Sequence, residues 1–415
     1  MARAPKILVA GAGIGGLAAA VTLRHVGARP HVFERAPELR AAGSGLGILS
    51  NASAALRELG VDLRLERYGQ ELRRFDISTR RGRLLRRMPT PDIAAETGAP
   101  SVLIHRADLL RALLDAAGDV PVTLGAQVSD FTAHPDGVEV RFADGTTAEG
   151  DALVGADGLY SAVRRRIAGP EPIREPGYIN WLATVPFRHP AVPTGYCGHF
   201  WDRGRRFGLI DIGGGRVYWW ATHNRPPEAA RSWTGGRAEI EELFRRFPEP
   251  VRSVIRRTPE EDVISVPARD RAFLDTWGDG PVTLLGDAAH PMLTSLGQGA
   301  AMAVEDSAVL ARCVATATDV TAGLRAYERA RRERTRLAVD ASWQASRSEQ
   351  EGGPLACALR NARLRRAPED VLREQTRALL VFPGLPPARV PDAVGASLPA
   401  PAAERPHRCG QPPGH

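Results

Sequence analysis

The glycine-rich stretch near the N-terminus constrains the fold more than any other feature of the sequence. A short apolar run over residues 6–10 leads into residues 11–16, which read Gly-Ala-Gly-Ile-Gly-Gly. Apolar residues then recur with helical period over 14–26, and residues 30–34 return to a strand pattern. This order predicts a βαβ unit whose first turn allows close backbone approach to a ligand.

Each glycine of this turn has a different predicted role. Gly11 permits a tight turn, Gly13 lets backbone amides approach a pyrophosphate, and Gly16 lets the helix pack closely on the sheet. Glu34 ends the second strand, where its carboxylate can accept hydrogen bonds from ribose hydroxyls. Met1–Leu23 superficially resembles a secretory signal, but the glycine turn together with Glu34 favours dinucleotide binding.

The charge of the chain does not indicate a nucleic-acid partner. The net charge is +7, and arginine-rich runs occur over 80–87, 203–206 and 329–336. Because Lys6 is the only lysine, the arginines indicate a bias of the coding sequence, and the runs are expected to be solvated faces. No stretch approaches the roughly 20 apolar residues of a membrane helix, so we expect no integral membrane association.

The cysteines predict neither a disulfide framework nor a metal site. They are dispersed, without a Cys-x-x-Cys pair or a neighbouring histidine: Cys197, Cys313, Cys357 and Cys409. This usage fits a protein of the reducing cytoplasm.

The chain is long for one domain, and its pattern of residue types changes along its length. From about 171 to 225, aromatic and β-branched runs separated by turns predict antiparallel strands of a second lobe. An apolar strand over 281–285 returns the chain to the first lobe. The other predicted elements are strands over 100–104, 121–128, 137–142 and 150–156, and helices over 106–117, 236–247, 249–257, 299–317, 321–348 and 354–382.

Two further segments carry an acidic residue in a glycine turn. Residues 150–164 read as a buried strand, an Asp157-Gly158 turn and a helix capped by Ser161, which alone is equally compatible with an ordinary strand-to-helix connection. Residues 285–307 place Asp287 at the end of a buried strand, where it can bind a ribityl hydroxyl. A helix of small residues follows, and its N-terminal amides can meet an anion.

These three segments, in this order, resemble the class A flavoprotein monooxygenases, the para-hydroxybenzoate hydroxylase-like family. The likeness covers about residues 5–345. The Asp287–Asp306 segment and the strand Asp211–Ala221 look most like the branch that holds zeaxanthin epoxidase, 3-hydroxybenzoate 6-hydroxylase and salicylate hydroxylase.

The resemblance implies an α/β fold, in which a Rossmann-like FAD-binding domain carries an inserted antiparallel β-sheet substrate domain and C-terminal helices. The expected division is an FAD-binding domain over 1–75, 98–170 and 275–350, a substrate-binding domain over 76–97 and 171–274, a helical segment over 351–387, and a disordered tail over 388–415.

The resemblance also implies which residues contact a tightly bound FAD. Glu34 and Arg35 hold the adenosine ribose, and Arg106 reaches the central portion of the cofactor. The other implied contacts are Val128 to the adenine, Asp157 beside the pyrophosphate and the docking nicotinamide, Asp287 to the ribityl chain, Gly47 near the isoalloxazine, and Gly299 and Ala300 at the pyrimidine edge.

The implied reaction consumes NAD(P)H and dioxygen and proceeds through a flavin C4a-hydroperoxide. One oxygen atom enters an aromatic or olefinic small molecule by hydroxylation or epoxidation, in a setting of secondary metabolism. Two alternatives remain open from the sequence: a flavin-dependent reductase of prenyl-type substrates, and a non-catalytic flavoprotein that sequesters a small molecule.

The substrate chamber is less firmly indicated. The family's usual proline is Thr294 here, and its common Pro-Asn is Ser50-Asn51. Strand alternation places Tyr218 and Trp220 on one face, so both are candidate chamber residues, although both rings are equally compatible with a plain core role. His290 is expected to be structural, whereas His199 and His223 are weak candidates for a base.

Overall fold

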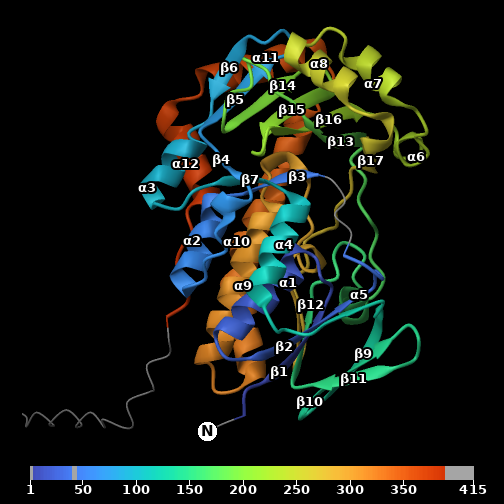
Figure 1. The fold of residues 1–415 in the computed structure, drawn as a ribbon, viewed down its shortest axis with the longest axis vertical. Coiled ribbons are helices and arrows are strands. Elements are labelled where there is room, and N and C mark those ends of the chain that lie inside the picture. The colour runs from blue at the N-terminus through green and yellow to red at the C-terminus, as the bar shows by residue number, and fades with distance from the viewer. Residues whose placement is uncertain (1–2, 40–43, 388–415) are drawn as a thin grey trace, which may run out of the picture.

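A computed structural model describes residues 3–39 and 44–387. Within this part the chain forms two lobes, and long helices extend from the first lobe toward the second (Figure 1). The tail over 388–415, which the sequence predicts to be disordered, lies outside the described residues.

A five-stranded parallel sheet in the order β18-β12-β1-β2-β8 forms the base of the first lobe. Its strands are β1 (Lys6–Ala10), β2 (Arg29–Glu34), β8 (Val122–Leu124), β12 (Ala152–Gly155) and β18 (Val282–Leu284). The strands β12 and β18 are buried along their whole length, as expected for parallel strands that are covered on both faces. The predicted βαβ opening is confirmed.

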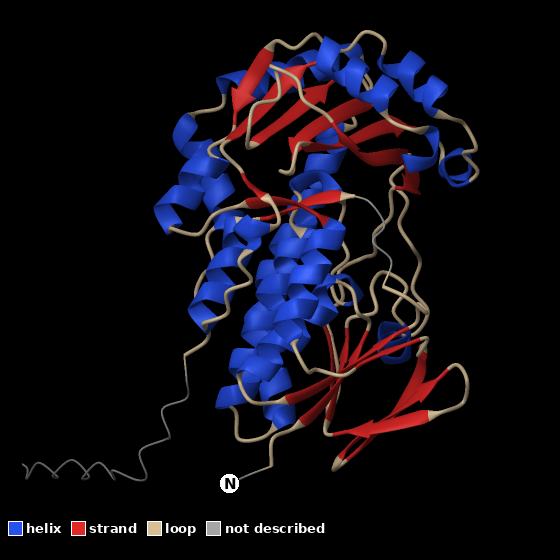
Figure 2. Cartoon of the chain, viewed as in Figure 1, coloured by secondary structure: helices blue, strands red, loops and turns tan. Residues whose placement is uncertain are grey.

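Helices pack against this sheet and against one another (Figure 2). They are α1 (Ile14–His25), α2 (Ser50–Leu59), α4 (Arg106–Ala117), α9 (Gly299–Thr316) and α10 (Val320–Glu349). Helix α9 is buried continuously from Ala301 to Ala311, because α1, α2 and α10 pack around it and its many alanines permit close approach. The sequence analysis did not predict α2.

A three-stranded antiparallel sheet flanks the first lobe. It consists of β9 (Val128–His134), β10 (Gly137–Phe142) and β11 (Thr147–Gly150). The predicted continuous strand over 121–128 is wrong, because β8 ends at Leu124 and Gly125 adopts a φ of 71° that turns the chain into this second sheet.

The second lobe is a seven-stranded sheet in the order β17-β13-β16-β15-β14-β5-β6. Its strands are β5 (Arg74–Thr79), β6 (Leu84–Arg87), β13 (Tyr178–Pro186), β14 (Tyr196–Trp201), β15 (Arg205–Asp211), β16 (Arg216–Asn224) and β17 (Ile264–Pro267). Its strands pair antiparallel as predicted, except that β14 pairs with β5 in parallel. Because β5 begins at Arg74, the boundary expected after residue 75 falls inside a strand.

One face of this sheet is covered by α6 (Pro227–Arg231), α7 (Arg237–Phe244) and α8 (Glu249–Arg257) (Figure 1). Its other face is turned toward the first lobe. Between the lobes lies a small antiparallel sheet in the order β3 (Gly45–Ile48), β7 (Val102–His105) and β4 (Gln70–Glu71). Along the chain, the 3-10 turn Leu65–Arg67 precedes β4, and α3 (Thr90–Thr97) precedes β7.

The sequence predicted one helix over 354–382, whereas the structure has two helices there. Helix α11 (Pro354–Arg366) ends before Pro368, and α12 (Glu369–Leu380) begins after it, since proline cannot donate an intrahelical hydrogen bond. Residues 3–39 and 44–387 contain no helix that combines the length and the hydrophobicity needed to cross a membrane.

Candidate cofactor and substrate site

In the glycine turn after β1, the packing of the protein leaves no room for a side chain at two of the glycines. A Cβ at Gly16 would lie 1.9 Å from the carbonyl oxygen of Gly11, and a Cβ at Gly11 would lie 2.5 Å from that of Ala156. Gly11 also has a φ of 100°. By contrast, a Cβ at Gly13 would meet no atom within 4 Å. Gly13 therefore borders open space at the start of α1.

The N-terminus of α1 is suited to an anion. Gly13 is its N-cap, no side chain caps its first amides, and its first turn carries no acidic residue. Such an end presents unpaired N–H groups and the positive end of the helix dipole. The Glu34 carboxylate lies beside this turn, where Oε2 accepts from the amide of Ala12 at 2.8 Å and Oε1 from that of Ala36 at 2.9 Å. Each oxygen retains capacity to accept from a ribose hydroxyl.

The adenosine side of this turn is lined by neighbouring loops. Arg35 is exposed directly after Glu34. The amide of Ala126 donates to the Glu34 carbonyl oxygen at 2.8 Å, and Val128 follows as the buried first residue of β9.

A second group of predicted residues lies at the start of α9. Gly299 and Ala300 open this helix, which has no side-chain cap and no acidic residue in its first turn. A Cβ at Gly299 would lie 3.8 Å from Oδ1 of Asp287, so the Asp287 carboxylate lies next to these amides. Desolvation by the surrounding protein raises the pKa of Asp287 although the residue is solvent-exposed, and the positive charges of His290 and Arg106 offset only part of this rise. The exposed Arg106, at the start of α4, therefore lies within electrostatic reach of Asp287.

Asp157 points into the protein. Its carboxylate accepts from the Ser161 hydroxyl and from the amide of Ala162 at 2.7 Å, so it caps α5 (Ala162–Ala168) together with the predicted cap Ser161. Burial raises the pKa of Asp157, while these hydrogen bonds lower it. Gly47 is half-buried on β3 against Leu49.

Arg164 is a buried residue next to the Asp287 turn to which the sequence analysis gave no role. It is 1% exposed, its Nη1 donates to the carbonyl oxygens of Ala288 at 3.2 Å and Ala289 at 2.8 Å, and it pairs with Glu171. Arg164 thereby links the turn that carries Asp287 to the first turn of α5. Its position at the close of the 150–164 segment was the only sequence signal.

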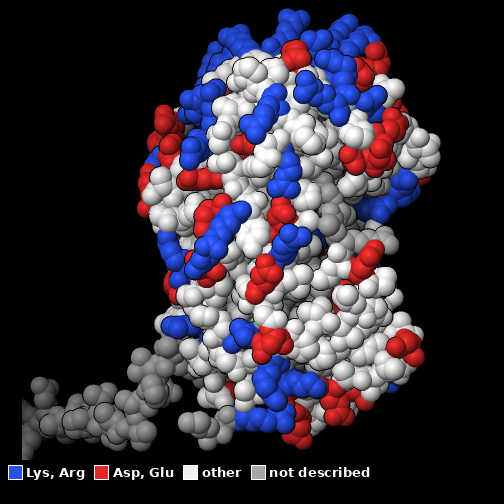
Figure 3. Space-filling view, in the orientation of Figure 1, with Lys and Arg blue, Asp and Glu red and all other residues white. Residues whose placement is uncertain are grey.

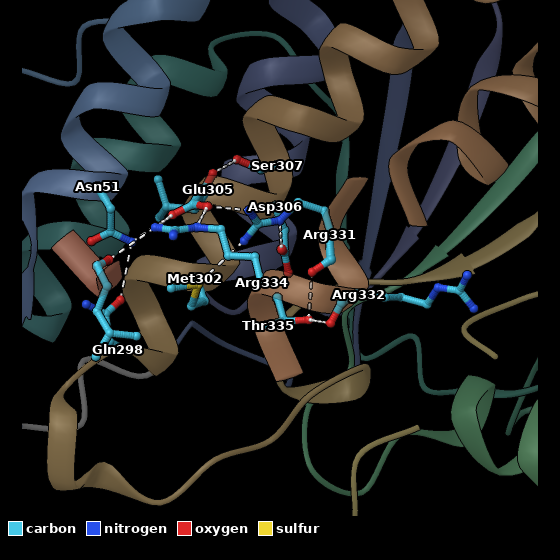
Figure 4. A network of polar contacts seen from close by, with 12 residues as sticks. Asn51, Gln298, Met302, Glu305, Asp306, Ser307, Arg331, Arg332, Arg334 and Thr335 are labelled. Atoms are coloured by element: carbon cyan, nitrogen blue, oxygen red, sulfur yellow. Dashed lines mark hydrogen bonds and ion pairs between the residues drawn. The ribbon is translucent and has the colours of Figure 1, made fainter. Parts of the chain in front are cut away.

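A buried ionic network lies beneath the start of α9 (Figure 4). Arg331 on α10 pairs with both Glu305 and Asp306 on α9, and its Nε lies 2.7 Å from Asp306 Oδ1. Asp306 Oδ2 accepts from the Gly286 amide at 3.1 Å and lies 2.6 Å from His290 Nε2. The network thus holds both ends of the turn 286–290 through Gly286 and His290.

The same network continues to α2. Asn51 Nδ2 donates to Glu305 at 2.8 Å and to the N-cap residue Gln298 at 3.2 Å, and Arg334 also pairs with Glu305 (Figure 4). Burial alone would raise the pKa of Asp306, but the charges of His290 and Arg331 outweigh it and lower that pKa to about 2.

The expectation that the arginine runs are solvated faces is wrong at two positions. Arg206 and Arg331 are each 1% exposed. Each is buried because a carboxylate from a distant part of the chain compensates its charge: Glu349 for Arg206, and Glu305 with Asp306 for Arg331.

The face of the seven-stranded sheet that is turned away from α6–α8 carries the candidate chamber residues. Tyr218 and Trp220 lie on it, whereas Trp219 points to the helices and donates to Thr258 Oγ1 at 2.9 Å. Tyr218 packs directly on Gly45 of β3, where a Cβ would lie 2.5 Å from the ring. Both rings therefore pack within the region between the two lobes.

Trp220 has aromatic and charged neighbours. His199 meets its ring edge-on with centroids 4.8 Å apart, and the Arg206 guanidinium lies 5.1 Å from its centroid. Burial, with a contribution from Arg206, lowers the pKa of His199 to about 3. Burial also lowers the pKa of His223, which stacks near Trp181.

Thr294 is exposed at the start of the 3-10 turn Thr294–Leu296. Its carbonyl oxygen accepts from the Gly297 amide at 3.1 Å. The preceding Leu293 is extended, with φ of −68° and ψ of 152°, which is the conformation favoured before proline. The backbone here is therefore compatible with the proline that the family usually has.

These residues fit an FAD molecule. Two uncapped helix N-termini, one with an adjacent ribose-accepting Glu34 and the other with an adjacent Asp287, supply donors for anionic groups and acceptors for hydroxyls. The open space at Gly13 is where a pyrophosphate requires room.

Comparisons with known proteins agree with this geometry. A family model described as FAD binding domain matches residues 5–342. The aurachin C monooxygenase/isomerase of Stigmatella aurantiaca is 38% identical over 376 residues, which cover 91% of this chain and 98% of that protein. A FAD-dependent urate hydroxylase of Klebsiella pneumoniae is 32% identical over 333 residues, covering 80% and 87%.

Solved structures extend the likeness to the whole fold. The structure of Klebsiella pneumoniae HpxO complexed with FAD and uric acid superposes with a TM-score of 0.84 at 28% identity, covering 91% of this chain and 97% of that one. The chain therefore belongs to the FAD-binding family of class A flavoprotein monooxygenases and is an FAD-dependent oxidoreductase.

Proposed function

We propose that this enzyme uses NAD(P)H and dioxygen to insert one oxygen atom into a neutral aromatic or olefinic small molecule. The observation that carries this proposal is the pair of uncapped helix N-termini, those of α1 and α9, in the first lobe. The face of the seven-stranded sheet that carries Tyr218 and Trp220 is turned toward this lobe. Bound FAD supplies the redox and oxygen-activating chemistry.

In this proposal FAD lies between the glycine turn and the start of α9. Glu34 and Arg35 face its ribose, Val128 its adenine, and Arg106 its centre. The amides of Gly299 and Ala300 stabilise negative charge on the reduced ring system, as a preorganised donor pair does. Asp287 binds the ribityl chain, and Gly47 leaves room beside the ring. Asp157 caps the N-terminus of α5, and Arg164 of this helix donates to the backbone of the turn that contains Asp287.

The sheet residues support a neutral substrate. The Arg206 charge is matched by Glu349, and the ring of His199 is neutral at pH 7 because its pKa lies near 3. The remaining wall is aromatic through Tyr218 and Trp220, which excludes water from the reacting oxygen. The relatives named above are a monooxygenase/isomerase of aurachin C and a hydroxylase of urate, so both are named for oxygenation of a small molecule. The described cysteines are free and buried, in keeping with a cytoplasmic enzyme.

Labelled dioxygen tests the reaction. With the substrate present, NAD(P)H and dioxygen should be consumed together, and mass spectrometry should find one labelled oxygen atom in the product. Product formed without dioxygen would indicate the reductase alternative, and substrate binding without NAD(P)H oxidation would indicate sequestration.

Removal of the Glu34 carboxylate tests the cofactor site. Glu34→Ala should weaken FAD binding by about 1–3 kcal/mol, because hydrogen bonds to a charged group are lost. Titration of the apoprotein with FAD, followed by flavin fluorescence, measures the change. Glu139→Ala on β10, a residue outside the implied FAD contacts, is the matched control and should leave FAD affinity at the parent value. Equal affinities for all three proteins would contradict the assignment.

Thr294 offers a test of the chamber. Thr294→Pro and Thr294→Val should retain FAD, because the Asp287 turn and the glycine turn are untouched, and the extended Leu293 accommodates proline. We expect a larger fraction of NAD(P)H oxidation to end as hydrogen peroxide, because this turn shapes the space beside the substrate. Peroxide released per NAD(P)H oxidised is the measurement. Unchanged coupling in both variants would show that Thr294 has no part in the chamber.

A further inference from the structure

The end of the second lobe farthest from the parallel sheet carries an arginine-rich surface that the proposed reaction does not use. Figure 3 shows basic side chains gathered over this end of the molecule. We define the arginine–leucine surface as the loop between β5 and β6, the loop between β14 and β15, and the outer side of α11. Residues 80–88 and 354–367 contain no acidic residue.

These segments form one continuous surface. Leu364 of α11 packs with Leu85 of β6 and Trp201 of β14. Arg360 lies over the Trp201 ring, 5.1 Å from its centroid, and the Gly204 amide donates to the Glu351 carbonyl oxygen at 2.8 Å. Helix α11 therefore lies across the ends of these strands and presents its opposite side outward.

The outward side of α11 is apolar along its first half. Cys357 and Arg360 point inward and are buried, whereas Leu355 is 81% exposed and Leu359 is 49% exposed. Leu355 and Leu359 are one helical turn apart, so they lie on the same face of α11 and form one exposed apolar patch.

Arginines lie in all three segments of this surface. They are exposed, and no described carboxylate forms an ion pair with them: Arg81, Arg83, Arg203, Arg363, Arg365 and Arg366. The nearby Asp202 is already paired with Arg80 and Arg205, at 3.3 Å each. The surface therefore combines an excess of positive charge with exposed leucines.

We propose that this arginine–leucine surface docks the enzyme on an anionic phospholipid bilayer. Protruding leucines insert among acyl chains while arginines meet the headgroup phosphates, which is the combination that interfacial proteins use. A second copy docking by the same face would place like charges opposite one another. A nucleic acid would satisfy the arginines and leave the leucines in water. The proposal concerns attachment to a membrane surface and does not depend on which substrate the enzyme uses.

Co-sedimentation of the full-length holoenzyme with vesicles tests the proposal. Binding should be strong to vesicles of phosphatidylcholine with phosphatidylglycerol, weak to phosphatidylcholine alone, and weaker at high salt. The double variant Leu355→Asp with Leu359→Asp should lower the vesicle partition coefficient at least about tenfold, since a buried leucine contributes that much. The triple variant Arg363→Gln, Arg365→Gln and Arg366→Gln should lower it by roughly 100-fold.

Leu337→Asp is the matched control, because this leucine is 48% exposed on α10, outside the surface. It should bind vesicles as the parent does, and all variants should retain FAD and turnover in a vesicle-free assay. The proposal is overturned if the parent shows no preference for anionic vesicles, or if the leucine variant binds like the parent. It is likewise overturned if the parent binds duplex DNA or associates with itself, and does not bind vesicles.

Discussion

Gly16→Ala is expected to disrupt the glycine turn and yield a purified protein without flavin. A Cβ at this position would lie 1.9 Å from the carbonyl oxygen of Gly11, and backbone cannot yield to such a contact without moving α1 away from β1. The stability of the apoprotein should fall at the upper end of the ~1–3 kcal/mol that overpacking costs. FAD retention should be lost because the α1 amides and Ala12, which Glu34 holds, move together.

The variant Gly13→Ala distinguishes an effect on FAD binding from an effect on folding stability. Gly13 has an ordinary φ of −73°, and a Cβ there meets no protein atom within 4 Å. The apoprotein should therefore unfold in urea as the parent does, while FAD binds roughly 10- to 100-fold more weakly because the methyl group occupies space that the pyrophosphate needs. FAD titration with urea denaturation measures both effects. If Gly13→Ala binds FAD like the parent, the pyrophosphate does not lie at this turn.

Arg331→Met is expected to cause the second large effect. The variant leaves Glu305 and Asp306 buried without their shared cation, and removal of one partner from a buried ion pair costs about 3–5 kcal/mol. FAD affinity should also fall, since Asp306 holds the Gly286 amide and His290. Arg329→Met, an exposed neighbour on α10, is the control and should change neither quantity by more than about 0.5 kcal/mol.

The pH dependence of this variant gives a sharper test. In the parent the pKa of Asp306 is lowered to about 2, so its contribution to stability is present above the ordinary pKa of 3.8 and is lost as pH falls toward 2. Without Arg331 the pKa of both carboxyl groups should rise, even with Arg334 still beside Glu305 and His290 beside Asp306, so protonation should destabilise the variant less than the parent. The difference in free energy of unfolding between variant and parent should therefore shrink from pH 7 to pH 5. A constant difference would show that the carboxylates do not rely on Arg331.

The sequence by itself determined the parts whose causes are local. The turn after β1 needs Gly11 because of its positive φ and Gly16 because a neighbouring carbonyl occupies the Cβ position, and both requirements appear as a pattern within six residues. The helical period of α1 and the apolar run of β1 are likewise local. The resemblance to the family rests on three such segments, and the comparisons confirm it.

Other features were decided by the tertiary structure alone. Arg331 is buried because Glu305 and Asp306 come from another helix, and Arg206 because Glu349 approaches from the end of α10. In sequence both belong to arginine runs that look solvated. The parallel pairing of β14 with β5 and the burial of Asn51 against Glu305 also join distant segments. A charge or strand edge is stabilised by whatever packs against it, and composition and spacing do not specify that partner.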